Sequence, residues 1–235
     1  MVKAGIWKEL LFPRRCAVCD EIVPLGRMIC PDCSDKIIYI KDPCCIKCGK
    51  ELKRQEKQYC DDCVKRQHRF TAGTALYDYG SMSDSVFRFK NKGRAEYAEF
   101  YGMELAEQKG GWLRSIKPDA LVPVPIHVSK KNARGYNQAE LIARVLSVHT
   151  GIPVNDSLIG RCRRTKPMKD LTDRERQNNL KKAFKILQND VKLDTIVIID
   201  DVYTTGSTID AMAQVLQSVG ISRIYFLTLT IGRGV

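Results

Sequence analysis

The sequence predicts an α/β protein with a mostly parallel β-sheet flanked by helices, preceded by a small cysteine-rich module. Residues 196–199 are four β-branched apolar residues without alternation, a pattern typical of a strand buried on both faces in a parallel sheet. A helix-patterned segment from about 207 and another apolar strand at 223–230 follow at short intervals. Strand, helix and strand in this order predict a right-handed parallel crossover. Nine of the ten cysteines precede residue 64, which predicts the separate N-terminal module.

The remaining elements are expected between residues 72 and 149. The patterns there predict strands at 72–79 and 119–124 and helices at 83–90, 94–108 and 136–149. Because the composition changes near residue 70, we expect two domains, 1–70 and 71–235. No apolar stretch is long enough to span a bilayer, and residues 1–13 lack the apolar centre and cleavage site of a signal peptide. We therefore expect a cytoplasmic protein with no membrane span.

Eight of the cysteines form four Cys-x-x-Cys knuckles. The pairs are Cys16/Cys19, Cys30/Cys33, Cys45/Cys48 and Cys60/Cys63. Each knuckle directs two thiolates at one ion, and two knuckles complete a tetrahedral Cys₄ zinc site. We expect about two structural zinc ions, bound either by sequential or by interleaved knuckles. A reducing compartment would not retain four such disulfides, and the evenly repeated pairs favour zinc over an iron–sulfur cluster.

Two adjacent carboxylates, Asp200 and Asp201, follow the apolar run directly. A turn rich in hydroxyl groups comes next, comprising Thr204, Thr205, Gly206, Ser207 and Thr208. Open α/β sheets bind their ligands at the carboxyl ends of strands, and backbone N–H groups at a helix start suit a phosphate. Carboxylates suit sugar hydroxyls, a divalent cation, or both. A buried strand with a well-capped helix is the alternative, but it leaves the two carboxylates unexplained. The pattern predicts a site for a phosphorylated sugar.

The chain carries a net charge of +12, and two further stretches are rich in basic residues. Lys130, Lys131 and Arg134 are expected in a loop after the strand at 119–124, where they suit pyrophosphate oxygens. Residues 161–185 hold ten Lys and Arg against three acids, a net +7, and include Arg161, Arg163, Arg164 and Lys166. This segment is a candidate for binding the backbone of a nucleic acid. For both stretches, a solvated basic surface is the alternative.

The segment 196–208 resembles the 5-phosphoribosyl 1-pyrophosphate (PRPP) signature of type I phosphoribosyltransferases. Three further features resemble the ComF/GntX branch of these proteins: Pro-Val-Pro at 123–125, Arg-Gly-Tyr-Asn-Gln at 134–138, and Arg-Cys-Arg-Arg-Thr-Lys-Pro at 161–167. With the tandem knuckles in front, the resemblance covers nearly the whole chain. It implies a double zinc ribbon followed by a phosphoribosyltransferase-like domain.

The resemblance also implies residue roles. Asp200 and Asp201 would face the ribose hydroxyls and help to retain magnesium, and residues 204–208 would wrap the 5′-phosphate. Lys130, Lys131 and Arg134 would lie near the pyrophosphate, and the loop from Arg161 would close over bound PRPP. The branch is implicated in natural transformation, where it handles single-stranded DNA after DNA uptake.

Three functional hypotheses remain open at this point. The first is a magnesium-dependent phosphoribosyltransferase whose acceptor nothing in the sequence identifies. The second is a PRPP-binding protein that also binds single-stranded DNA, with Tyr39, Tyr59, His68 and Phe70 either stacking on bases or covering the core of the zinc module. The third is a non-catalytic scaffold whose ribbons recruit a helicase-type partner.

Overall fold

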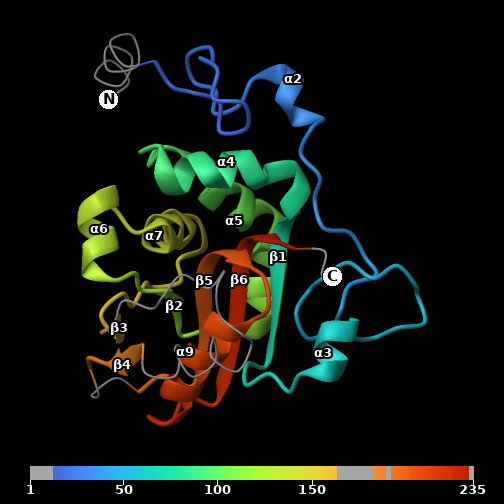
Figure 1. Ribbon diagram of the computed structural model, residues 1–235, viewed down its shortest axis with the longest axis vertical. Helices are drawn as coiled ribbons and strands as arrows, with labels where there is room; N and C mark the ends of the chain where they lie inside the picture. Colours follow the sequence, from blue (N-terminus) through green and yellow to red (C-terminus); the bar gives the residue numbers. More distant parts are fainter. Residues whose placement is uncertain (1–12, 163–182, 189–191, 233–235) are drawn as a thin grey trace.

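A parallel sheet of four strands forms the centre of the molecule (Figure 1). The computed structural model describes residues 13–162, 183–188 and 192–232. The strands are β1 (Ala72–Asp78), β2 (Ala120–Pro123), β5 (Thr195–Tyr203) and β6 (Arg223–Ile231), in the spatial order β1-β6-β5-β2. All three pairings are parallel, and Ile196 to Ile199 of β5 are fully buried between neighbouring strands and both covering layers. The predicted α/β fold with a mostly parallel sheet is confirmed.

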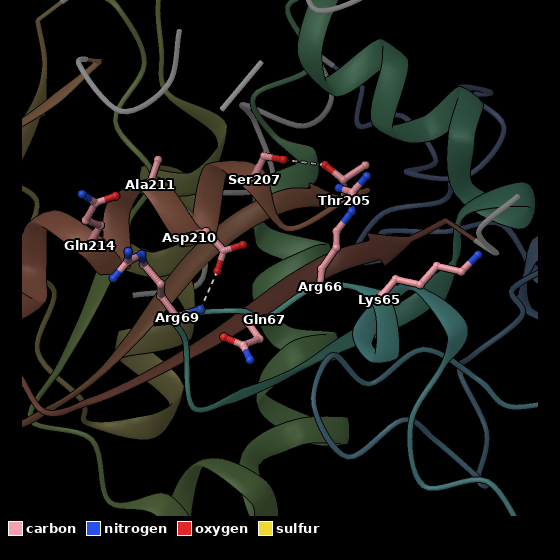
Figure 2. A pocket seen from close by; sticks show the side chains of 9 residues that line it. All are labelled: Lys65, Arg66, Gln67, Arg69, Thr205, Ser207, Asp210, Ala211 and Gln214. Atoms are coloured by element: carbon pink, nitrogen blue, oxygen red, sulfur yellow. Dashed lines mark hydrogen bonds between the residues drawn. The ribbon is translucent and has the colours of Figure 1, made fainter. Parts of the chain in front are cut away.

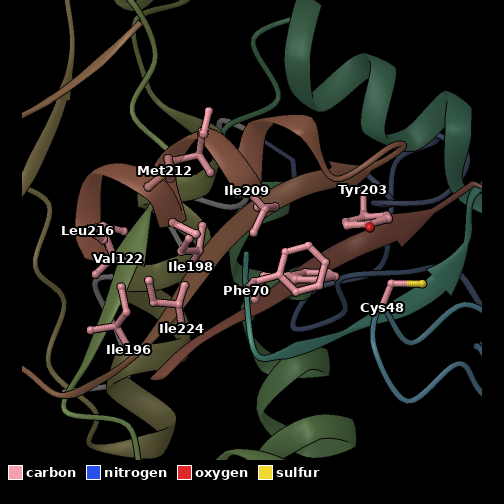
Figure 3. Packing of buried hydrophobic residues seen from close by; sticks show 14 of the residues in the cluster. Cys48, Phe70, Val122, Ile196, Ile198, Tyr203, Ile209, Met212, Leu216 and Ile224 are labelled. Atoms are coloured by element: carbon pink, nitrogen blue, oxygen red, sulfur yellow. The ribbon is translucent and has the colours of Figure 1, made fainter. Parts of the chain in front are cut away.

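Successive residues of β5 point to opposite faces of the sheet and enter two separate cores. Val197 and Ile199 pack with helices α4 (Tyr79–Asn91), α5 (Tyr97–Ile116) and α7 (Gln138–Thr150). On the other face, Ile196 and Ile198 pack against α9 (Ser207–Gln217), whose Met212 and Leu216 point at the sheet (Figure 3). The antiparallel pair β3 (Ile159–Arg161) and β4 (Phe184–Ile186) covers the same side, with β4 against α9.

Several helices differ from what the sequence predicted, and α4 begins at Tyr79 instead of 83 because the Asp78 side chain caps it there. Helix α5 runs to Ile116 instead of 108, because Leu113 is buried in the core and its packing outweighs the low helix propensity of Gly110 and Gly111. The stretch expected as a basic loop around Lys130 is instead a short helix, α6 (Val128–Arg134). The His127 side chain accepts a hydrogen bond from the Ser129 backbone at its start, and Gly135, with φ of 82°, ends it.

The two zinc-ribbon segments attach to opposite faces of the sheet. Short helices α2 (Pro31–Ser34) and α3 (Asp61–Lys65) begin within the second knuckle of each ribbon, directly after Cys30 and Cys60. The first ribbon docks on α4 and α5, where the Asp20 carboxylate accepts hydrogen bonds of 2.7 and 2.8 Å from Arg94, between the two helices, and a further one from Tyr97 of α5. The second ribbon joins the core on the α9 face, where Cys45 and Cys48 pack in the same cluster as Phe70. Each ribbon is therefore part of a different layer.

The segment between the ribbons covers the edge of the sheet. Tyr39 pairs in antiparallel fashion with Tyr77 of β1, and the flanking backbone bonds are Ile40 N–H to Leu76 O at 3.1 Å and Asp78 N–H to Ile38 O at 2.9 Å. This pairing satisfies the exposed backbone groups of an edge strand while the chain crosses from one face to the other. Within the described ranges, no helix is both long and apolar enough to cross a membrane.

Candidate functional site

The eight knuckle cysteines form two four-thiol clusters. Cys16, Cys19, Cys30 and Cys33 make the first, and Cys45, Cys48, Cys60 and Cys63 the second, with all ligand atoms of a cluster within 4.8 Å of one another. The Sγ atoms of Cys19 and Cys30 lie 3.6 Å apart, and those of Cys48 and Cys60 lie 3.7 Å apart. Four sulfurs at about 2.3 Å from one zinc ion would be ~3.8 Å apart, so each cluster fits a single ion. The knuckles pair sequentially.

The two adjacent carboxylates lie at the carboxyl end of β5 and point to opposite faces of the sheet. Asp201 Oδ1 accepts a bond from Lys90 Nζ at 2.8 Å. Burial, and secondarily the charge of Asp201, raise the pKa of Asp200 to about 7, while Lys90 and Arg161 act in the opposite direction. The Asp201 N–H donates to Asp200 Oδ1 at 2.9 Å, which fixes the Asp200 side chain. The acid pair is thus held between cations from two different layers.

The turn after β5 leads into an uncapped helix start. Gly206 is the N-cap of α9 and has φ of 75°, and no side chain bonds to the free N–H groups of the first turn. The hydroxyls of Thr205 and Ser207 bond to each other at 2.9 Å instead of capping the helix. Capping by Ser207 or Thr208 therefore does not explain the hydroxyl-rich turn. Its N–H groups and hydroxyls lie together at a helix N-terminus, an arrangement suited to a phosphate.

Lys90 contacts the candidate site although the sequence did not indicate it. It occupies the last turn of α4, where a lysine has no distinguishing pattern. The motif at 134–138 holds that end of the helix. Tyr136 Oη donates to Phe89 O at 2.5 Å, and Gln138 Nε2 approaches Phe89 O and Lys90 O at 3.4 and 3.5 Å. Burial disfavours the charge on Lys90, but Asp201 outweighs it, so the pKa of Lys90 is raised.

The other predicted basic residues divide into two groups. The first group, Arg134 and Arg161, lies near the acid pair and Lys90. Arg134 donates to Gln138 Oε1 at 3.0 Å, and its charge acts on Lys90. Arg161 of β3 lies over the Phe184 ring at 5.4 Å and interacts electrostatically with Asp200. Lys131 instead bonds to Glu140 of α7 at 3.2 Å, and Lys130 is exposed on α6. Arg163, Arg164 and Lys166 lie outside the described residues.

Comparison with known proteins identifies the domain. Residues 112–233 match the family model described as phosphoribosyl transferase domain, and residues 7–64 match the double zinc ribbon domain. The chain belongs to the phosphoribosyl transferase domain family. Both ends of β5 and the whole of the turn at 204–208 fall within the match, as do the basic residues of α6 and β3.

Similar proteins extend over most of the chain. Competence protein F of Haemophilus influenzae is 28% identical, covering 91% of this chain and 95% of that protein. DNA utilization protein YhgH of Salmonella typhimurium is 29% identical over 89% and 86%, and competence protein ComFC of Bacillus subtilis is 25% identical over 82% and 79%. The resemblance to the ComF branch is confirmed. A purine phosphoribosyltransferase structure from Pyrococcus horikoshii aligns with 57% of this chain and 73% of its own, at 21% identity and a TM-score of 0.36.

Proposed function

We propose that this protein binds PRPP together with magnesium at the carboxyl end of β5. The observation that carries the proposal is the position of Asp200 and Asp201 at the end of β5, which a short turn connects to the uncapped N-terminus of α9. The turn at 204–208 would bind the 5′-phosphate through N–H groups and hydroxyls. The carboxylates would accept hydrogen bonds from the ribose hydroxyls, so one strand end and one turn recognise both halves of a phosphorylated sugar.

Magnesium fits the acid pair, because carboxylate oxygens are its usual protein ligands alongside phosphate oxygens. When bound, it neutralises charge on the pyrophosphate. Lys90, Arg134 and Arg161 supply positive charge from α4, α6 and β3 and would bind pyrophosphate oxygens. The half-buried Asp200, in its ionised form, would stabilise positive charge that develops on the ribose if the pyrophosphate leaves.

We further propose that PRPP binding serves the handling of single-stranded DNA during natural transformation, in the cytoplasm. The similarity to competence protein F and to DNA utilization protein YhgH supports this role, and the net +7 of residues 161–185 suits a DNA backbone. A reducing compartment suits two sites built from thiolates. Transfer of the phosphoribosyl group to an acceptor, and recruitment of a helicase-type partner by the ribbons, remain hypotheses alongside it.

Isothermal titration with PRPP and magnesium tests the proposal. Wild-type protein is expected to bind PRPP, and Asp201→Asn is expected to bind at least tenfold more weakly. Asp84→Asn, an exposed carboxylate on α4, is the matched control and should bind as wild type does. Equal binding by wild type and Asp201→Asn would contradict the assignment. Pyrophosphate release in the presence of a panel of nucleobases then distinguishes turnover from binding alone.

A further inference from the structure

A polar pocket of about 340 Å³ lies between the end of the second ribbon and helix α9 (Figure 2). Lys65, Arg66 and Arg69 line one wall, and Thr205, Ser207 and Asp210 line the other. Every lining side chain is polar or charged except that of Ala211. The volume is within the range of ligand pockets, but the chemistry of the walls is that of an anion site.

The two walls are joined by hydrogen bonds that do not use the pocket-facing cationic groups. Asp210 accepts one bond from the Arg69 N–H and makes a second with His68 Nδ1, both of 2.8 Å. Gln217 of α9 also donates to Arg69 O at 3.0 Å. These bonds hold the backbone of residues 68–69 against α9, and they occupy both oxygens of the one carboxylate in the pocket. The pocket is therefore preorganised, with positive charge in excess.

The pocket shares a wall with the proposed phosphate turn. Thr205 and Ser207 belong to both, and the buried His68 ring lies beneath the turn. A Cβ added to Gly206 would be 3.0 Å from His68 Cε1. The second ribbon is thus in direct contact with the turn proposed to bind the 5′-phosphate. A ligand in the pocket would lie next to the 5′-phosphate of PRPP, and the side chains of Thr205 and Ser207 would face both ligands.

The cations are spread along the pocket. Figure 2 shows Arg66 reaching toward Thr205, whereas Arg69 extends toward Gln214 at the opposite end. Such spacing suits an extended polyanion better than a single small phosphate. None of the lining residues is aromatic, and two of the aromatic residues considered for base stacking, His68 and Phe70, have side chains that are almost completely buried. The pocket therefore suits the sugar–phosphate backbone of a DNA strand, whose bases would point away from the pocket.

We propose that this pocket binds phosphodiester groups of a single DNA strand beside the PRPP site. The inference rests on the proposed role in DNA handling and adds the place on the protein where the DNA strand would bind. It makes the segment that follows the second ribbon, through Lys65, Arg66 and Arg69, a direct DNA-binding element. It also places the DNA strand close to the turn at 204–208, so that DNA and PRPP would bind next to each other at the N-terminus of α9.

Fluorescence anisotropy with a labelled oligothymidine tests the location. Arg66→Gln with Arg69→Gln should weaken binding at least tenfold and reduce the slope of log affinity against log salt by about 1 for each phosphate that the variant no longer neutralises. Lys65→Gln with Arg69→Gln provides a second pair, and zinc content and thermal unfolding verify that each variant is folded. The matched control is Arg54→Gln, an exposed arginine on the same ribbon outside the pocket, which should bind as wild type does.

The possible outcomes separate the proposals. If wild type binds the oligonucleotide and both double variants bind it equally well, the pocket assignment is overturned while DNA handling stands. If wild type does not bind the oligonucleotide, both fail. If PRPP or inorganic phosphate displaces the oligonucleotide, and the double variants lose PRPP binding in parallel, the pocket serves a small phosphate ligand and the strand assignment is overturned. Retained PRPP binding by the double variants, with DNA binding weakened, supports the proposal.

Discussion

Lys90 Nζ lies 2.8 Å from Asp201 Oδ1, so the last turn of α4 supplies a cation to the acid pair at the end of β5. The partners are far apart in the sequence, and each side chain is mostly covered, with 29% and 11% exposed. The contact explains why the motif at 134–138 matters structurally, because Tyr136 and Gln138 of that motif hold the helix end from which Lys90 extends.

Replacing Lys90 is expected to weaken PRPP binding. Lys90→Met removes a positive charge next to the proposed pyrophosphate position and leaves Asp201 without its ion-pair partner. Hydrogen bonds to charged groups contribute about 1.5–3 kcal/mol, so titration should show a loss of roughly tenfold or more in affinity. Lys90→Arg should retain part of the affinity. Lys92→Met, an exposed lysine at the C-cap of the same helix, is the control. Unchanged affinity in Lys90→Met would remove Lys90 from the site.

Gly206 is predicted to be intolerant of any side chain. A Cβ there would lie 2.6 Å from Tyr203 Oη, and φ of 75° is unfavourable for other residues. Gly93 has a similar φ of 68° but nothing within 4 Å of an added Cβ. Gly206→Ala and Gly93→Ala therefore share the backbone strain, and only the first displaces the turn. Calorimetric titration should show that PRPP affinity falls in Gly206→Ala alone. Parallel decreases in both variants would show that strain, not the close approach of Tyr203, is responsible.

The sequence predicted the parts of the site that are contiguous along the chain. Asp200 and Asp201 end one apolar run, the turn at 204–208 comes soon after it, and the knuckles repeat a local spacing, so short-range patterns were enough to propose these parts of the candidate site. Pairing of distant elements was not accessible in this way. Lys90 reaches Asp201 only because the sheet brings α4 beside β5, and residues 65–69 line a pocket only because the second ribbon packs on α9.

Local caps and packing account for the remaining differences. The stretch from Lys130 became a helix because His127 and Gly135 supply its ends, and Lys131 consequently bonds to Glu140 on α7. Sequential pairing of the knuckles also needed the fold, since both arrangements use the same ligands. The attachment of the ribbons to opposite faces follows from the segment that pairs with β1, and no composition signal indicates it.

The two zinc sites are predicted to differ in their effect on the phosphoribosyltransferase-like domain. Elemental analysis should find about two zinc ions per chain, and about one in either Cys19→Ser or Cys63→Ser. Cys63 packs against the α9-face core, near Phe70, whereas Cys19 belongs to a small separate cluster. Cys63→Ser should therefore lower both the melting temperature and PRPP affinity. Cys19→Ser should leave PRPP affinity close to that of wild type. Equal losses of PRPP affinity in the two variants would contradict a specific role for the second ribbon.

Asp200 is predicted to reduce stability at neutral and higher pH in the absence of ligand. Its pKa is raised from 3.8 to about 7, chiefly by burial. As pH rises from about 4 to about 7, the unfolded state releases the Asp200 proton before the folded state does, so the free energy of unfolding falls. Above pH 7 the loss of stability stays constant.

Asp200→Asn removes the ionisation. In magnesium-free urea denaturation, this variant should be more stable than wild type at pH 8, by up to about 4 kcal/mol, because each unit of pKa shift corresponds to about 1.4 kcal/mol. The difference should shrink toward pH 4, where the carboxyl is largely protonated in the folded state and about half protonated in the unfolded state. A stability difference that does not change with pH would show that ionisation of Asp200 is not its cause.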